Sequence, residues 1–563
     1  MNTPYFLRIA ALSSLLLASP LAFGATFYVN ATSGSDMSTG LTTDHAWKTL
    51  AKVSAAKFAP GDSILLARNE IWREQLIVPS SGQAKARLTI GAYGFGAQPM
   101  IAGSDTLSGW RFVSGATYAA KVSTSPTNLY DGDAGLQSVP MLKHPTRSEV
   151  DGTPGSWCFD KAKETVYVQL ADQSNPDTHS VAAAVRKFGI YSANHSFVSV
   201  HDIAVKEVTQ AAIYFCNVSP PTGTVGTNYD NNFNEYNTIE RCTLRNFGGL
   251  ISWDGGIYVR GSTGPGPKPM LRGWRILSNT VGRIENPPVI DYDRAGIEVR
   301  GTVGAVVSYN NVATVNKYAI RVCADFAGQT SASPTVSHNT ITHSFCNIAI
   351  ADTDDATVTH NVIFDSAGMG IGIGHSSNAL VAYNLIYNLT ESDDMTLYNG
   401  IDINAGALNG RAYHNTVARV ASACLTLEGD NNTPSQGWIV ENNIFDGRRN
   451  YESIANQHSV VYIAGDVTQF KFAHNLYADT VKHAAKAFQF PIGVYSPFSA
   501  FGPFTNDTTS RFVTDPQFVG RNDFHLKDTS RAVGLGEAIS GIEQAVVGTS
   551  IDCGVFPFVD IVY

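Results

Sequence analysis

Two groups of residues in the middle of the chain combine side-chain types and spacings that could support chemistry. The first, the cationic group, consists of Tyr258, Arg260, Asp293, Glu298, Arg300, Lys317 and Arg321. Arg260 and Arg300 hold the same place in neighbouring copies of a repeated segment, so their guanidinium groups are expected about 5 Å apart. Like charges this close repel unless an anion lies between them. The group therefore predicts a site for a carboxylate, which Arg holds at two points, or a solvated ion-pair ladder with Glu298 and Asp293.

The second group, the acidic group, consists of Asp352, His375, Asp402 and Glu428. Asp402 and Glu428 are one copy and two residues apart, which strand geometry converts to about 8 Å. That separation falls in the window for the acid and base of an inverting glycoside hydrolase. Asp352 and His375 hold matching places in adjacent copies. The crowding of oxygen atoms also fits a Ca²⁺ site, with Asp293 and Asp352 as candidate ligands, or polar residues that line turns.

Both groups belong to a strand-like segment that recurs along the chain. Its copies are AAIYFCN (211–217), GGIYVRG (255–261), AGIEVRG (295–301), YAIRVCA (318–324), CNIAIAD (346–352), MGIGIGH (369–375), NGIDINA (399–405) and ACLTLEG (423–429). Strand alternation places the central Ile or Leu of each copy, and the apolar residue two places on, toward a core, and both groups on the opposite face. A unit that returns every 20 to 50 residues predicts a solenoid, because one unit cannot bury its apolar face alone.

A second element alternates with the first, a β-run that carries an asparagine. These asparagines are Asn279, Asn310, Asn339, Asn361, Asn384, Asn415, Asn443 and Asn475. Equivalent side chains in adjacent coils lie about 4.8 Å apart, so stacked amides can hydrogen-bond along the axis. The series predicts a buried structural ladder and no part of an active site.

Composition and charge agree with a strand-rich protein. Charged residues make up 15% of the 563 residues, and the 50 glycines suit many tight turns. The formal net charge of −9 argues against a nucleic-acid partner. The seven cysteines form no CxxC pair and no Cys/His cluster, which favours buried small apolar side chains.

The ends of the chain differ from the repeats. Arg8, an apolar run over 9–17 and the small residues around Ala22 and Gly24 predict a signal peptide over 1–24, and hence secretion or export to the periplasm. No later run is long and apolar enough to span a membrane. The helical spacing of Trp47, Leu50 and Val53 predicts a helix over 46–58. The expected organisation is an N-terminal cap with first strands (25–104), a β insertion (105–185), rungs (186–480) and a C-terminal capping region (481–563).

The N-terminal part also resembles a known family. TFYVNATSGSD, AWKTLAKV, PGDSILLARNEIWREQL and IGAYGFGAQPMIAGSD, all between residues 26 and 105, resemble the opening of exported parallel β-helix proteins of the pectate-lyase-like superfamily. DPQFVGRNDFHLK at 515–527 resembles the way these proteins close their far end. The resemblance implies an all-β fold, a single-stranded right-handed parallel β-helix, and activity on polysaccharides.

Together the resemblance and the cationic group predict a lyase that cleaves an acidic, uronate-containing polysaccharide by β-elimination. Arg260 and Arg300 would neutralise the uronate, Lys317 or Arg321 would be the base, and Tyr258 would donate a proton. One alternative is a glycoside hydrolase that uses the two carboxylates of the acidic group. Another is a non-catalytic carbohydrate-binding or matrix protein. The expected partner is an acidic polysaccharide or oligosaccharide bound by a monomer, with Ca²⁺ as the candidate cofactor.

Overall fold

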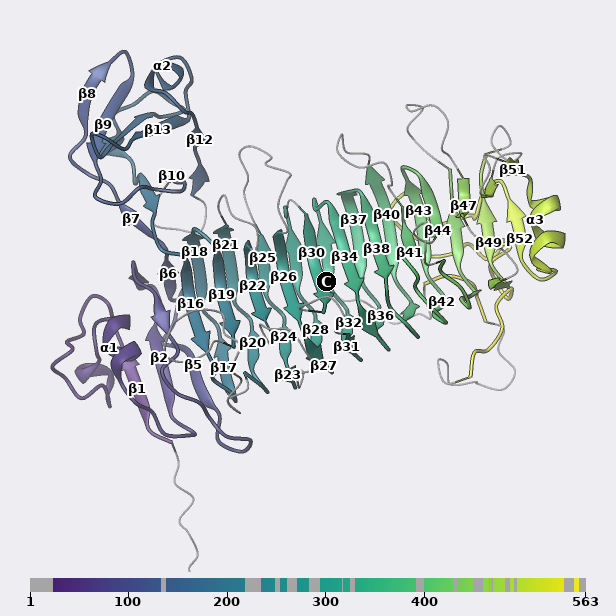
Figure 1. Ribbon diagram of the computed structural model, residues 1–563, viewed down its shortest axis with the longest axis horizontal. Coiled ribbons are helices and arrows are strands. Elements are labelled where there is room, and N and C mark those ends of the chain that lie inside the picture. The colour runs from purple at the N-terminus through teal and green to yellow at the C-terminus, as the bar shows by residue number, and fades with distance from the viewer. Residues whose placement is uncertain are drawn as a thin grey trace, which may run out of the picture.

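The computed structural model describes residues 24–132, 138–217, 234–248, 254–260, 271–282, 294–315, 317–324, 330–390, 399–428, 434–448, 459–464, 466, 469–480, 487–490, 494–540 and 551–555. Three 13-stranded sheets run along a coil that occupies most of the length of the molecule (Figure 1). Successive rungs pair in parallel register along all three sheets. The predicted parallel β-helix is therefore confirmed.

One of these sheets, the site sheet, carries both groups of candidate residues. Its strands, in order, are β4 (Leu76–Ile77), β16 (Phe188–Ala193), β19 (Ala211–Cys216), β22 (Asp254–Arg260), β26 (Arg294–Arg300), β30 (Tyr318–Cys323), β34 (Cys346–Ala351), β38 (Met369–Gly374), β41 (Ile401–Asn404), β44 (Ala423–Leu427), β47 (Ser459–Ile463), β50 (Phe488–Phe490) and β51 (Val494–Ser496). The second sheet runs from β1 (Thr26–Val29) to β48 (Lys471–Ala473), and the third from β3 (Ile71–Trp72) to β52 (Arg511–Val513). The predicted inward positions, such as Ile257, Ile297 and Ile320, are aligned in register and fully buried.

The predicted asparagine ladder is present at one corner of the coil. Asn310 is representative: its Oδ1 accepts from the backbone N and the Nδ2 of Asn279, at 2.9 and 3.0 Å. Its own N and Nδ2 donate to Oδ1 of Asn339, each at 3.0 Å. The pattern continues to Asn475, whose backbone N donates to Ser510. Each rung is thus hydrogen-bonded to the next by side chains as well as by strands.

The N-terminal helix α1 (Leu50–Ala55) is shorter than the predicted 46–58. Thr49 is extended and its side chain accepts from the backbone N of Lys52, which starts the helix there. Trp47 precedes this cap in an extended segment that bridges Val29. The apolar residues Trp47, Leu50 and Val53 are nevertheless all buried, so the spacing identified the packed face but not the helix boundaries.

Strands between the first rungs and the main coil form a separate layer. β8 (Arg111–Ser114), β9 (Thr117–Lys121), β12 (Leu142–Lys143), β13 (Ser156–Asp160) and β14 (Thr165–Gln169) make a five-stranded sheet. β7 (Ser104–Thr106), β10 (Leu129–Asp131), β11 (Val139–Pro140) and β15 (Ala182–Ala184) make a four-stranded sheet that leads back to the coil. This layer stands beside the N-terminal end of the coil (Figure 1) and packs around its own core, with Trp157 fully buried.

A buried carboxylate joins this layer to the coil. Glu207, in β18 (Ala204–Val208), accepts hydrogen bonds from the hydroxyl groups of Ser104 and Ser138. The Nζ of Lys206 lies 2.9 Å from Oε1 of Glu207, and both side chains are 1% exposed. Because the two serines belong to the inserted layer and Glu207 to the coil, the network fixes one against the other.

We expect Glu207→Ala to lower the free energy of unfolding by about 3–5 kcal/mol, because it leaves a buried ammonium group without its carboxylate partner. Limited proteolysis should cut the variant first in the segment 105–185. The matched control is Asp105→Ala, which breaks a surface ion pair with Arg186 and should cost less than about 1 kcal/mol. Equal effects of the two substitutions would contradict the assigned role of Glu207.

The far end of the coil is closed by α3 (Phe498–Thr505). Phe501 stacks on Phe488 with ring centroids 4.0 Å apart and also packs against Tyr477, which covers the last rung of the core. No helix in the described part of the chain is long and apolar enough to cross a membrane.

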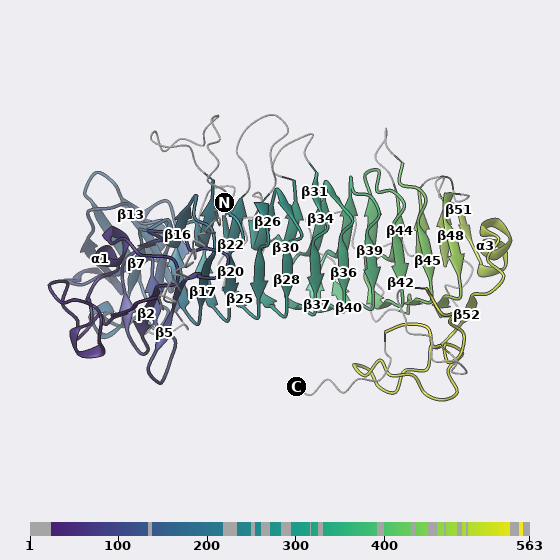
Figure 2. The ribbon, with the colours of Figure 1, turned by 90° about the horizontal axis from the view of Figure 1, so that it is seen from below.

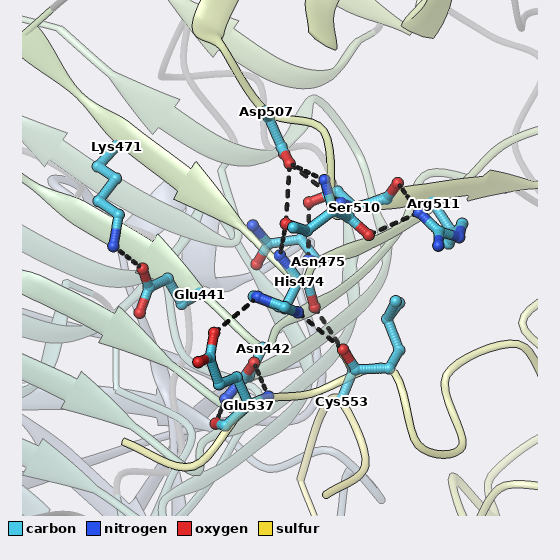
Figure 3. A network of polar contacts seen from close by, with 12 residues as sticks. Glu441, Asn442, Lys471, His474, Asn475, Asp507, Ser510, Arg511, Glu537 and Cys553 are labelled. Carbon is cyan, nitrogen blue, oxygen red and sulfur yellow. Dashed lines mark hydrogen bonds and ion pairs between the residues drawn. The ribbon is translucent and has the colours of Figure 1, made fainter. Parts of the chain in front are cut away.

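The segment after α3 folds back along the outside of the coil (Figure 2). Figure 3 shows how it is held: His474 Nε2 lies 2.9 Å from Glu537 Oε2, and Asn442 Nδ2 donates to the Glu537 carbonyl at 2.7 Å. Cys553 Sγ donates to the His474 carbonyl. These contacts fasten the C-terminal segment to the turns of the last rungs, away from the site sheet. Residues 1–23 of the predicted signal peptide lie outside the described residues.

Candidate active site

The structure places the strand residues of both predicted groups on the outer face of the site sheet. Strand register aligns one outward row as Tyr258, Glu298, Arg321, Ala349, Gly372, Asp402 and Thr426. A parallel row reads Arg260, Arg300, Cys323, Ala351, Gly374 and Asn404. The alternation inferred from the repeats is therefore correct for both rows.

The centre of the cationic group is buried, which the sequence pattern did not indicate. Glu298 is fully buried and Arg300 is 4% exposed. Glu298 Oε1 accepts from Arg300 Nε at 2.5 Å and also contacts its Nη2. Arg321 Nη1 lies 3.8 Å from the same oxygen. The expected solvated ion-pair ladder is thus wrong in one respect: the ion pair is present, but it is shielded from water.

The arginines of this group stay protonated although they are largely buried. Burial has the largest single effect and lowers the pKa of Arg300, but Glu298, Cys323 and Tyr258 together raise this pKa above its usual value. For Arg321 burial again has the largest single effect and lowers the pKa, but Cys323, Glu298 and Tyr318 together raise it above its usual value. Arg321 therefore stays cationic, which argues against the base role predicted for it.

Tyr258 is placed as a proton donor rather than an acceptor. Its side chain is 2% exposed, packs on Tyr214 at 5.2 Å and lies 5.9 Å from the guanidinium of Arg300. Burial and the Glu298 carboxylate raise the pKa of the phenol well above its usual value. The hydroxyl makes no hydrogen bond with any described residue.

Lys317 and Arg321 flank one aromatic ring at the edge of the cationic group. The Nζ of Lys317 lies 5.5 Å and the Cζ of Arg321 lies 4.6 Å from the centre of the Tyr318 ring. Arg260 pairs in register with Arg300 on the other side of the group and is half-buried. The predicted cations of the described strands are therefore neighbours. Asp293 lies outside the described residues.

Asp402 and Glu428 form the centre of the acidic group. Asp402 pairs in register with Thr426, and Glu428 follows two residues later, as the repeat predicted. Asp402 is 4% exposed; burial and, second, the charge of Glu428 raise its pKa to about 7. Burial also raises the pKa of the half-buried Glu428. Asn404, which the repeat places near Asp402 on the same strand, donates to Asp402 Oδ2 at 3.0 Å.

Small residues separate the two groups. Ala349 and Gly372 lie in the row between Arg321 and Asp402, and three strand spacings correspond to about 14 Å. A side chain at position 374 would meet Oδ1 of Asn404 at 2.8 Å, so glycine there lets Asn404 lie across β38. Between the two charged groups the outer face therefore carries small residues, and the Met369 side chain lies over Gly372.

Asp352 and His375 lie apart from these centres, in the turns after β34 and β38. Both have positive φ, both side chains are 52% exposed, and their closest charged atoms are 3.9 Å apart. Such an exposed pair contributes little to stability. Within the described ranges, no group of three or more His, Cys, Asp and Glu side chains is placed to hold a metal ion.

Comparisons with known proteins agree on the architecture. A family model for the right handed beta helix region matches residues 271–445. The structure of XylC in complex with xylose is similar, with 14% identity, a TM-score of 0.58, and coverage of 88% of this chain and 87% of that chain. A GH136 lacto-N-biosidase from Eubacterium ramulus is 11% identical, with a TM-score of 0.42 and coverage of 87% and 67%. Pectate lyase Pel9A is 12% identical, with a TM-score of 0.34 and coverage of 94% and 96%. At these identities the likeness concerns the fold alone. A search of curated proteins finds no match.

Proposed function

The chain is a right-handed parallel β-helix protein, and we propose that it is an exported glycoside hydrolase in which Asp402 and Glu428 carry the reaction. One observation carries the proposal: burial and the neighbouring Glu428 raise the pKa of Asp402 to about 7, so this carboxyl keeps a proton near neutral pH. Glycoside hydrolysis needs one protonated and one ionised carboxyl group on either side of the scissile bond. Two neighbouring carboxyl groups with different environments supply that combination.

The reaction follows from the positions of the two carboxyl groups. Asp402 donates its proton to the glycosidic oxygen as the bond to the anomeric carbon breaks. Glu428, as the ionised partner, takes a proton from the water that adds to this carbon, or attacks the carbon itself before water releases the sugar. Asn404 holds Oδ2 of Asp402, while Oδ1 makes no hydrogen bond with the described residues and is the oxygen able to face a substrate.

The cationic group supports β-elimination less well. A lyase needs a base for the proton next to the uronate carboxyl and a cation to neutralise that carboxyl. Arg300 already pairs with Glu298, and the raised pKa of Arg321 keeps it protonated. The Asp402 and Glu428 pair therefore supports hydrolysis better than the cationic group supports β-elimination.

The test is a screen of the purified protein against plant, algal and animal polysaccharides and their oligosaccharides, with two readouts. We expect new reducing ends without the ultraviolet absorbance of an unsaturated uronate. Glu428→Gln should lower kcat by about 10²- to 10⁴-fold, because it removes the base or nucleophile but keeps the shape. Asp355→Asn, which changes an exposed carboxylate in a turn three rungs from Glu428, is the matched control and should leave kcat unchanged. Unsaturated products, or full activity in Glu428→Gln, would overturn the proposal.

A further inference from the structure

A serine, a histidine and an aspartate of the inserted layer form a hydrogen-bonded chain that the hydrolysis proposed above does not use. Ser174 Oγ lies 2.9 Å from His179 Nε2, and His179 Nδ1 lies 2.8 Å from Asp131 Oδ1. The two ring nitrogens therefore connect a hydroxyl group on one side to a carboxylate on the other. This order of atoms is that of a Ser-His-Asp triad, in which the histidine takes the serine proton and the aspartate orients the histidine.

Strand pairing and one short turn bring the three residues together. Asp131 ends β10, which pairs with β15. Ser174 and His179 flank the 3-10 turn Pro176–Thr178, in the connection that leads from β14 into β15. The backbone N of His179 donates to the Pro176 carbonyl at 3.1 Å, which closes the turn. Each ring nitrogen of the histidine thus receives its partner from a different segment of the layer.

A second carboxylate also contacts the histidine. Asp172 Oδ2 lies 3.3 Å from His179 Nε2. Burial has the largest single effect and lowers the pKa of His179, but Asp131 and Asp172 together raise this pKa above its usual value. While His179 is protonated, its Nε2 donates and the cluster is an ion-pair network. Once His179 is neutral, with its proton on Nδ1 toward Asp131, Nε2 accepts from the Ser174 hydroxyl and becomes a base beside a nucleophile.

The cluster can be reached from solvent. The side chains of His179 and Asp131 are 28% and 20% exposed, and Ser174 is partly exposed. The backbone N of Asn175, the residue after Ser174, donates to no group in the described part of the chain. In one class of serine hydrolases the N–H that follows the nucleophile binds the oxyanion that forms on the substrate. Because the site lies at the surface, an ester, whose carbonyl group reacts more readily than that of an amide, is the substrate that it fits.

We propose that Ser174, His179 and Asp131 form a further active site, which hydrolyses esters of small carboxylic acids, such as an acetyl group on a sugar hydroxyl. Ser174 Oγ attacks the carbonyl carbon while its proton passes to His179 Nε2. The bond from this carbon to the alcohol oxygen then breaks, and His179 gives the proton to the leaving oxygen. Water, which gives a proton to His179, attacks the acyl-serine; the acid leaves and the proton returns to Ser174 Oγ. Asp131 touches only the histidine and is a positioning residue.

The test detects reaction at one serine. The full chain is incubated with a fluorophosphonate probe, which an activated serine attacks with loss of fluoride, and mass spectrometry locates the labelled residue. Hydrolysis of 4-nitrophenyl acetate is followed in parallel. We expect the label on Ser174, and both reactions should fall about a hundredfold or more in Ser174→Ala and in His179→Gln. Ser180→Ala, which changes an exposed serine next to the histidine, is the matched control and should keep both reactions.

The pH dependence of labelling distinguishes a triad from an ion-pair network. The rate should rise with pH through the pKa of His179, which lies above its usual value, because only the neutral imidazole accepts the serine proton. Asp131→Asn should slow labelling by about 10²- to 10⁴-fold. It should also move the midpoint to lower pH, since one of the two carboxylates that raise the pKa of His179 is removed. Asp131→Glu, which keeps the carboxylate, should restore part of the rate.

The outcomes are separate from those of the proposed glycoside hydrolase. β10 stands in the inserted layer beside the N-terminal end of the coil, whereas β41, which carries Asp402, lies further along it (Figure 1). Labelling of Ser174 should therefore be unchanged in Glu428→Gln. Thermal unfolding checks that each variant is folded, and Ser174→Ala decides if His179→Gln is not. Absence of label on Ser174 from pH 5 to pH 9, labelling that persists in a folded His179→Gln, or equal ester hydrolysis in the wild type and Ser174→Ala would overturn the proposal.

Discussion

Asp402→Asn is expected to lower the rate of glycoside hydrolysis by about 10²- to 10⁴-fold, because the amide has the shape of the carboxyl group but no acidic proton to donate. The substitution preserves the contact site for Asn404 at position 402. The loss should appear in kcat more than in KM, since the proton is transferred in the transition state. Initial rates on a substrate identified in the screen, at several substrate concentrations, measure both.

The pH dependence of the rate tests whether the loss of activity in Asp402→Asn comes from the missing carboxyl proton. In the wild-type protein the rate should fall as pH rises through about 7, where Asp402 ionises. On the acid side the rate should fall as Glu428 gains a proton. This fall should occur at a pH above the usual pKa of a glutamate, because burial raises the pKa of Glu428. The residual activity of Asp402→Asn should lack the alkaline fall. A wild-type profile that stays flat from pH 6 to pH 9 would contradict the assignment of Asp402 as acid.

The pH dependence of stability distinguishes a loss of chemistry in Asp402→Asn from a loss of folding. The pKa of Asp402 is raised from 3.8 to about 7 in the fold, so the stability that comes from its buried neutral form is present at pH 4 and is lost as pH rises through 7. At pH 8 Asp402→Asn should therefore unfold at a higher temperature than the wild type, with a gain of up to about 4 kcal/mol, and at pH 4 the difference should vanish. A variant that is inactive yet more stable at pH 8 has lost chemistry and not its fold.

The coil could be predicted from the sequence because its determinants repeat. From Asn279 to Asn475 each rung presents an amide at the ladder position of Asn310, and the site sheet repeats an apolar residue at the position of Ile297, so each side chain meets its counterpart one rung away. Alternation then fixes the face on which Arg300 and Asp402 lie. Only local, periodic information is needed for these inferences, which is why they agree with the structure.

Burial and detailed pairing were not available from the same pattern. Alternation shows that Glu298 and Arg300 face away from the core, but not that they are shielded from water or that they bind each other. The base role of Arg321 assumed that neighbouring cations would dominate its pKa, whereas Cys323 and Glu298 have the larger effect. The raised pKa of Asp402 depends on the depth of its carboxyl group, and depth is set by packing that no single repeat encodes. The choice between the two groups therefore required the structure.

Asn310→Ala is expected to destabilise the coil by about 3–5 kcal/mol. The substitution removes the acceptor of the Asn279 backbone N, at 2.9 Å, and the donor to the Ile276 carbonyl, at 3.0 Å, and leaves both groups buried. Each buried unsatisfied group costs about 1–3 kcal/mol, and Oδ1 of Asn339 loses the Nδ2 of Asn310 while it keeps the backbone N of that residue. Asn311→Ala is the matched control, because Asn311 is the next residue and its side chain is exposed. Urea unfolding followed by circular dichroism measures both variants. The midpoint should fall markedly for Asn310→Ala, whereas the free energy of unfolding of Asn311→Ala should change by less than about 0.5 kcal/mol.

The location of the destabilisation in Asn310→Ala tests the ladder as strongly as its magnitude does. In a solenoid each rung contacts only its neighbours, so a broken ladder bond weakens the interface between two rungs rather than the whole coil. Amide hydrogen exchange in Asn310→Ala should therefore accelerate first in the strands on either side of position 310, including β26 and β30, which carry the cationic group. Uniform acceleration along the chain, or equal destabilisation by Asn310→Ala and Asn311→Ala, would show that the amides do not act as a ladder. Local acceleration would also mean that the ladder helps to keep β26 and β30 in register on the site sheet.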